Sequence, residues 1–203
     1  MNVSMPPWIA RLRAVVDASA LEGLEPHGFT DESGNRRAVD VPLIAWLVGQ
    51  RFELDAPLSI DLALWSVLAR GSGDVSADWA EHGPLQDAEA PSRGEVAIEV
   101  WTERELSAIQ ALWTLGVERG KRAWCDRAEL AARWCVEELQ PDNATAHPWG
   151  VNVFATLAGG GDIEAELYAQ TLVHNCQVGT GRPGRFANLV LLASLRSLEA
   201  ADR

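Results

Sequence analysis

HPWGVNVFATLAGGGDIEAELYAQTLVHNCQV, residues 147–178, decides the fold class. Pro148 is typical of the first turn of a helix, where its missing N–H costs no hydrogen bond. The run Gly159–Gly161 ends the apolar periodicity, and Asp162 is well placed to cap a following helix. The stretch therefore predicts two antiparallel helices joined by a glycine turn, the first beginning at Pro148 and the second ending near Val178.

The same helical periodicity covers most of the chain. A capping box, in which Thr102 and Glu105 exchange side-chain-to-backbone hydrogen bonds, predicts a helix start. The segment 39–52 is short enough that a buried strand is the alternative to a helix. Besides the hairpin, we expect helices over residues 7–21, 39–52, 58–70, 102–116, 125–140 and 183–200.

A short repeat links two of these helices. ALWTLG (111–116) and VFATLA (153–158) lie 42 residues apart, and each precedes a turn and a longer helix. A repeat of about 40 residues built from helical hairpins is typical of α-solenoids and α/α toroids. The sequence therefore predicts an all-α fold, an array of antiparallel helical hairpins that forms a partial α/α toroid or a solenoid-like stack.

From Trp101 to Ala200, the succession of hairpins resembles the α/α-toroid repeats of terpenoid cyclases, protein prenyltransferase β subunits and some glycoside hydrolases. The Asp-x-Asp-Asp acid motif of the cyclases is absent. Asp142, His174 and Cys176 also lack the spacing of the prenyltransferase zinc site. The resemblance therefore implies an architecture and transfers no functional residue. Because 203 residues are too few for a closed toroid, we expect an open or partial array.

The length of the chain suits one domain over residues 1–203. Residues 71–95 are rich in Gly, Pro, Ser and acidic residues, which predicts a long irregular loop. Trp79 and Leu85 would hold part of this loop to the body. We expect the loop to separate an N-terminal helical half from a C-terminal half of helical hairpins. Five of the nine tryptophans fall at core spacing: Trp8, Trp65, Trp113, Trp124 and Trp134.

The net charge of −12 argues against nucleic acid and anionic membranes, which both bind cationic surfaces. Lys121 is the only lysine among 17 basic residues, a bias typical of a GC-rich bacterial genome. The N-terminus lacks the apolar core of a secretory signal, and no apolar stretch reaches the roughly 18 residues of a membrane span. Three cysteines without a CxxC pair fit reduced thiols, so we expect a soluble cytoplasmic protein.

No cofactor or metal motif stands out. GGGDIE (159–164) lacks the Lys-Ser/Thr that follows the glycines of a phosphate-binding loop. His174 and Cys176 lie two residues apart on a predicted helix and therefore diverge by about 200°, which keeps them from holding one metal ion. We expect neither a cofactor nor a metal.

The antiparallel hairpin would place the start of its first helix beside the end of its second. That geometry gathers a candidate catalytic set, His147, His174 and Asp142, in which a histidine oriented by an aspartate serves as general base. The structural alternatives are a surface histidine at position 147 and a half-buried His174 bonded to a neighbouring helix. The residues expected to bind substrate are Trp149, Asn152, Asn175 and Arg182.

Two functions follow from these patterns. The first is a protein-interaction or self-associating module, because an open helical array leaves apolar faces uncovered. It predicts a homo-oligomer or a protein partner, and an exposed apolar patch. The second is an α/α-toroid-like enzyme, a hydrolase or lyase that acts on a carbohydrate or lipid-like substrate through His147, His174 and Asp142. Glu137 and Glu138, with Asp142, are an alternative acid–base group for glycoside hydrolysis, or else a solvated helix end.

Overall fold

The structure is a computed structural model that describes residues 6–54, 59–73, 75, 81–86, 97–139, 141 and 146–203. Within these ranges the regular structure is helical and includes no strand, which confirms the predicted all-α fold. The α-helices are α1 (Pro6–Val15), α2 (Asp40–Val48), α3 (Ile60–Arg70), α4 (Ile98–Arg119), α5 (Arg122–Glu138), α6 (Val151–Gly159), α7 (Ile163–Asn175) and α8 (Arg185–Ala201). Two short 3-10 helices, η1 (Ala18–Leu21) and η2 (Pro26–Gly28), connect α1 to α2.

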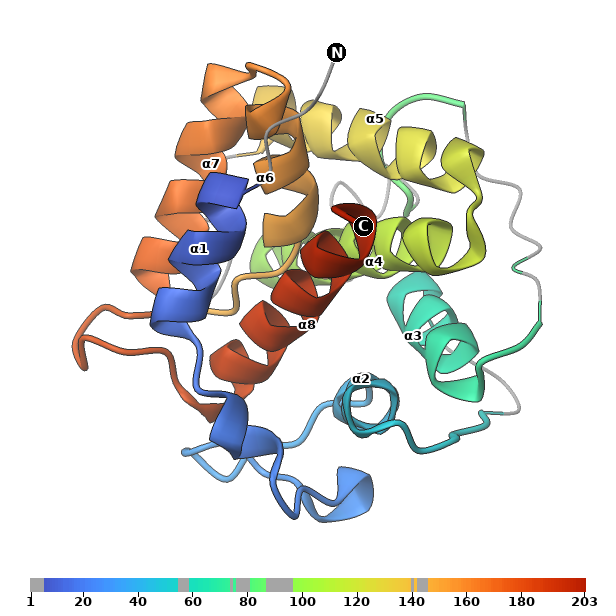
Figure 1. Ribbon diagram of the computed structural model, residues 1–203, viewed down its shortest axis with the longest axis vertical. Coiled ribbons are helices and arrows are strands. Elements are labelled where there is room, and N and C mark those ends of the chain that lie inside the picture. The colour runs from blue at the N-terminus through green and yellow to red at the C-terminus, as the bar shows by residue number, and fades with distance from the viewer. Residues whose placement is uncertain are drawn as a thin grey trace.

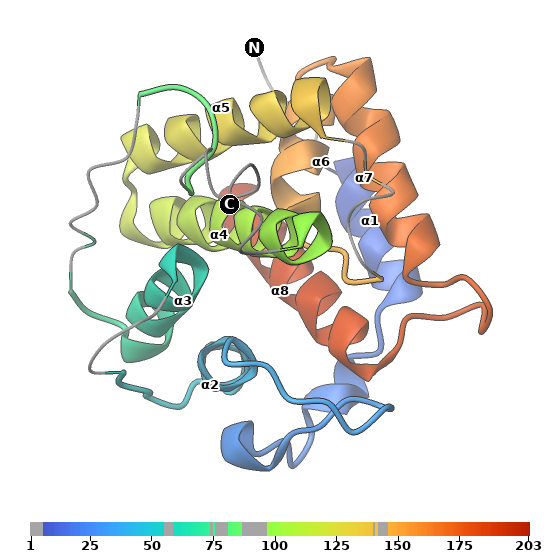
Figure 2. The same ribbon diagram turned by 180° about the vertical axis from the view of Figure 1, so that it is seen from behind.

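The helices pack as an array of antiparallel hairpins (Figure 1). α2 pairs with α3, α4 with α5, and α6 with α7, while α1 closes against α8. α4, α6 and α8 contact one another and form an inner group, and α5 and α7 lie outside it, as the reverse view also shows (Figure 2). Because α4 contacts α3, α5, α6 and α8, a side chain on α4 is positioned by most of the array.

One apolar core extends from α1 to α8. Its centre includes a run of indoles, with the rings of Trp46 and Trp65 5.7 Å apart and those of Trp65 and Trp149 5.9 Å apart. This run joins both halves of the chain. Of the tryptophans predicted to be core, Trp8, Trp65 and Trp113 are buried, whereas Trp124 and Trp134 are only partly buried.

The predicted capping box is wrong, because α4 begins four residues before Thr102. Thr102 is fully buried inside the helix, and its hydroxyl has no hydrogen-bond partner in the part of the chain that the structure describes. Glu105 caps a different segment. Its carboxylate accepts the backbone N–H groups of Leu85 (2.6 Å) and Gln86 (2.9 Å), so the second half of the motif holds the connection between α3 and α4.

The end of α4 also differs from the prediction. The helix continues through Gly116 to Arg119, and Gly120, with a φ of 61°, ends it in the left-handed conformation. Gly116 serves a packing role instead, because a Cβ there would lie 2.6 Å from the Cys125 sulfur on α5. Because Gly116 has no Cβ, α4 and α5 can approach each other closely.

The opening hairpin is confirmed except at its ends. Asp162 accepts a hydrogen bond from the Ala165 N–H and caps α7, as predicted. α6 starts at Val151 rather than in the turn of Pro148, since Gly150 is left-handed (φ 79°) and donates its N–H to the Gln110 side chain. α7 ends at Asn175, three residues before the predicted end.

The N-terminal half follows the sequence pattern closely. Residues 40–48 form a helix and not a strand, and α3 ends at Arg70 before Gly71, as predicted. The first helix is shorter than expected because Asp17 bonds to Ser19 and redirects the chain into η1. Leu85 of the predicted long loop is buried, whereas Trp79 lies outside the described residues. No helix in the described part of the chain is long and apolar enough to cross a bilayer.

Candidate functional site

α4 is buried along most of its length, but two residues within this buried stretch are accessible. Residues 101–116 are buried almost without a break, but Glu103 and Arg104 open onto the surface. Beside them lies a pocket of about 330 Å³ between α3, α4 and the loop before α2. Trp149 contributes an apolar wall. The polar groups of the lining come from Arg37, Ser59, Asp61, Glu103, Arg104 and Ser107. We call this cavity the Glu103 pocket.

His147 joins two charged residues of this pocket. Its Nδ1 is hydrogen-bonded to the Glu103 carboxylate, and its Nε2 lies 3.2 Å from Nη2 of Arg37. A guanidinium can only donate hydrogen bonds, so Nε2 is the acceptor and the ring proton resides on Nδ1, facing Glu103. The imidazole therefore orients both the carboxylate and the guanidinium.

Arg37 is fixed from its other side by two aspartates. Asp31 accepts its Nη2 at 2.8 Å, and the second oxygen of Asp31 accepts the backbone N–H groups of Ser33 and Asn35. Asp40, in the first turn of α2, accepts the backbone N–H of Arg37 at 2.8 Å. The loop between η2 and α2 is thereby folded around one guanidinium, which points toward α4.

Phe186, in the first turn of α8, forms the apolar support of the cluster. The guanidinium carbon of Arg37 lies 4.2 Å from the centre of its ring, and the His147 ring meets it edge-on at 4.9 Å. Trp149 packs against the same ring at 5.7 Å. These contacts shield the polar groups from water on one side and strengthen their mutual interaction.

Gln110 fixes the backbone that carries His147 and Trp149. Its side-chain oxygen accepts the N–H of Gly150, and its nitrogen donates to the carbonyl of Val190 on α8. Both bonds are buried, and together they bind α4, α6 and α8 to each other. The sequence HPWG is therefore rigidly held above the Glu103 pocket.

The pKa values of the two carboxyl groups in the pocket are shifted in opposite directions. Burial would raise the pKa of Glu103, but hydrogen bonds from His147 and Trp149 and the charge on Arg37 outweigh it and lower the pKa below its usual value. Burial dominates at Asp61 and raises its pKa, despite hydrogen bonds from Ser59 and the backbone of Leu62. One oxygen of Asp61 is buried and has no hydrogen-bond partner among the described residues. The pocket thus pairs a carboxyl whose pKa is lowered with a carboxyl whose pKa is raised.

The structure brings together two residues of the site predicted from sequence. His147 adjoins the Glu103 pocket and Trp149 lines it. Asn152 is buried in α6, where it donates to Thr114 at 3.4 Å, and its side-chain oxygen has no hydrogen-bond partner within the described ranges. Asp142, the predicted acid, lies outside the described residues.

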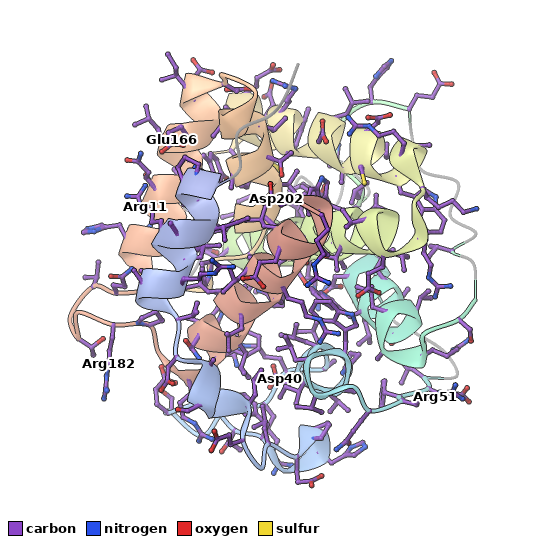
Figure 3. All side chains as sticks on the ribbon, in the orientation of Figure 1. Arg11, Asp40, Arg51, Glu166, Arg182 and Asp202 are labelled. Carbon is purple, nitrogen blue, oxygen red and sulfur yellow. The ribbon has the colours of Figure 1, made fainter. Side chains whose placement is uncertain are left out.

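The other predicted residues lie elsewhere. His174 is exposed and Asn175 half-buried at the end of α7, and Glu137 and Glu138 are exposed at the end of α5. Arg182 projects from the edge of the molecule, whereas Asp40 of the Arg37 cluster lies at the start of α2 (Figure 3). Among the described residues, no hydrogen bond, ion pair or ring contact joins His174, Asn175 or Arg182 to His147. Arg182 instead borders a separate cavity with Asp17, Glu32 and Asn188.

A comparison of the chain with protein-family models, with curated proteins and with solved structures finds no match. The geometry of the Glu103 pocket is therefore the basis for a functional interpretation. In the described part of the chain, no three His, Cys, Asp or Glu side chains are grouped so as to hold a metal ion.

Sequence reasoning missed Glu103, Arg37 and Asp61. Glu103 is the second residue of the four-residue motif taken for a capping box, and Asp61 has the usual place of an acid in the first turn of a helix. Arg37 is 110 residues from His147 in the sequence, and Glu103 is 44 residues away. No local spacing signals contacts at such separations. The one available signal was His147 itself, a histidine before a proline.

Proposed function

We propose that this protein is a hydrolase or lyase that acts on a small carbohydrate-like substrate in the Glu103 pocket by general acid–base catalysis. The observation that carries this proposal is the pair of carboxyl groups, Glu103 and Asp61, whose pKa values are shifted in opposite directions at one cavity. An acid and a base with separated pKa values are what proton transfer in both directions requires.

The lining of the pocket supports a hydroxylated ligand. Its polar lining consists of two guanidinium groups, two carboxyl groups and two hydroxyls, so both donors and acceptors are present. A sugar presents hydroxyl groups that donate and accept in the same manner. The volume of about 330 Å³ lies at the small end of ligand sites.

In the proposed reaction, protonated Asp61 gives its proton to the leaving oxygen of the substrate. Glu103 takes a proton from the attacking water, whose oxygen forms the new bond to carbon as the bond to the leaving oxygen breaks. Proton exchange with solvent then restores both carboxyl groups. His147 and Arg37 are positioning residues, because they hold Glu103 ionised and aimed at the pocket.

The test measures release of 4-nitrophenol from a panel of 4-nitrophenyl glycosides, together with the thermal shift caused by free mono- and disaccharides. We expect Glu103→Gln and Asp61→Asn each to reduce turnover by about 100-fold or more, the usual contribution of a general acid or base. Glu99→Gln is the matched control, because Glu99 is exposed on α4 one turn before Glu103.

The pH profile gives a second reading. Activity should rise as Glu103 loses its proton and fall at higher pH as Asp61 loses its own. The residual activity of Asp61→Asn should therefore no longer fall at high pH. The proposal fails if no glycoside is turned over and no saccharide raises the melting temperature. It also fails if Glu103→Gln is as active as Glu99→Gln.

A further inference from the structure

α7 exposes an unusual amount of apolar surface. Among the described residues, the three most exposed large apolar side chains are Ile163 (74% exposed), Val178 (66%) and Leu167 (58%). All three belong to α7 or to the turn that follows it. The other exposed side chains of this kind are 37–43% exposed and lie on α4 and α5.

Two of these side chains follow one face of the helix. Ile163 and Leu167 are four residues apart, and the exposed His174 continues the same face two turns later, while Val178 lies in the turn that follows the helix. We call Ile163, Leu167, His174 and Val178 the α7 stripe. The opposite face is already used, since Ala165, Tyr168 and Leu172 are buried against the body. α7 lies at the rim of the array in both views, so its outer face is accessible (Figures 1 and 2).

The charges of α7 differ between its ends. Glu164 is exposed in the first turn, while the last turn carries His174 and Asn175. Glu166, the other acid of the first turn, is already bonded to Trp8 and Gln170. A parallel pair of α7 helices would place Glu164 against its own copy, and the like charges would repel. An antiparallel pair places Glu164 near the amide and imidazole of the opposite end, and it also aligns the helix dipoles favourably.

We propose that the α7 stripe is the contact face of a homodimer, in which two copies of this chain pair antiparallel along α7. In this register Ile163 of one copy covers Val178 of the other, Leu167 covers His174, and Thr171 lies near the two-fold axis. The pairing sets the acidic first turn of each copy beside the last turn of the other, so it is self-complementary as a two-fold interface requires. It is independent of the Glu103 pocket.

The dimer should be weak. A stripe on one helix buries less than the roughly 800 Å² per partner of a standard interface, and the charge of −12 on each copy opposes association. We therefore expect a dissociation constant on the order of 10 μM at physiological ionic strength.

Sedimentation velocity over about 1 μM to 1 mM protein tests the dimer, since this range spans the expected constant. The weight-average mass of the wild type should rise from monomer to dimer. Leu167→Glu should raise the dissociation constant at least about 10-fold, because it introduces a charge at an apolar contact. Leu130→Glu is the matched control, because it makes the same substitution at a site away from the stripe. Leu130 is 43% exposed on α5. Circular dichroism verifies that both variants fold.

Cysteine cross-linking tests the orientation. Thr171→Cys should form an intermolecular disulfide with its own copy, whereas Ile163→Cys should cross-link only when mixed with Val178→Cys. The natural cysteines Cys125, Cys135 and Cys176 are buried and do not compete. A wild type that stays monomeric at every concentration overturns the proposal. So does a dimer that Leu167→Glu leaves intact, or a disulfide that Ile163→Cys forms with itself.

Discussion

At the scale of single residues, Asp31 is a carboxyl group whose pKa the fold lowers. Burial alone would raise its pKa, but hydrogen bonds from Arg37, Asn35 and Ser33 reverse the effect and lower the pKa from 3.8 to about 2. A carboxyl whose folded-state pKa is depressed stabilises the fold above its unfolded-state pKa and loses that contribution as the pH falls. Asp31 should therefore support the loop around Arg37 at neutral pH and progressively less below pH 3.8.

We predict that Asp31→Asn lowers the free energy of unfolding by about 2 kcal/mol at pH 7, the value that corresponds to its pKa shift. The difference from wild type should shrink to roughly half near pH 3, because the unfolded-state carboxyl is then largely protonated. Urea denaturation at a series of pH values measures both curves. Asp202→Asn, at the exposed end of α8, should stay within about 0.5 kcal/mol of wild type throughout. A pH-independent difference would show that Asp31 acts through packing.

Only some residues of the candidate site could be predicted from the sequence. His147 and Trp149 could be predicted as site residues because a histidine, a proline and a tryptophan adjoin a helix start. Their partners could not, since Glu103 and Asp61 occupy positions where acids ordinarily begin helices. What distinguishes them is burial and the neighbours Arg37 and Ser59, and both depend on tertiary structure.

At the scale of elements, Gly116 fixes the distance between α4 and α5. A Cβ at this position would lie 2.6 Å from the sulfur of Cys125, 3.0 Å from its backbone nitrogen and 3.2 Å from the carbonyl oxygen of Lys121. The last two contacts are with backbone, which cannot rotate away. Close approach and not conformational freedom explains the glycine, because its backbone is helical.

We predict that Gly116→Ala destabilises the protein by about 1–2 kcal/mol. Alanine normally gains about 1 kcal/mol over glycine inside a helix, but overpacking costs about 1–3 kcal/mol and displaces α5 as well. The urea midpoint by circular dichroism gives the sign. Adding Cys125→Ala should recover only part of the loss, since the backbone contacts persist. A stabilised Gly116→Ala protein would mean that the helices can separate without cost.

Elements could be predicted from sequence where their signals are local. Asp162 and the glycines before it determine a turn and a cap within a few residues, and both were predicted correctly. The helix ends that were predicted wrongly depend on partners distant in the sequence. Trp101 and Thr102 are buried inside α4 and so cannot mark its exposed start, and α6 begins after Gly150, whose N–H is accepted by Gln110, 40 residues earlier.

At the scale of the whole molecule, the two halves of the chain are joined by buried and partly buried hydrogen bonds. The indole of Trp65 donates to Ser107 on α4 at 3.1 Å, and that of Trp46 donates to Glu118 at 2.8 Å. Arg196 on α8 donates to the carbonyl oxygens of Trp46 and Leu47, each at 3.1 Å, which closes the end of α2. The Glu103 pocket lies across the same boundary, with Arg37 and Asp61 on one side and Glu103 on the other. A site of this kind exists only when both halves are folded together.

We therefore predict that the protein unfolds in one cooperative step, as a single domain. Tryptophan fluorescence reports both halves, since Trp46 and Trp65 lie in the first and Trp113 and Trp149 in the second, while circular dichroism reports the helices. The urea midpoints by the two probes should coincide. Trp65→Phe removes the indole N–H and packing at the boundary, so it should lower both midpoints equally, by a destabilisation of about 1–3 kcal/mol. If that variant instead separates the two transitions, the halves are independent units, and residues 71–95 are a linker between domains rather than a loop within one.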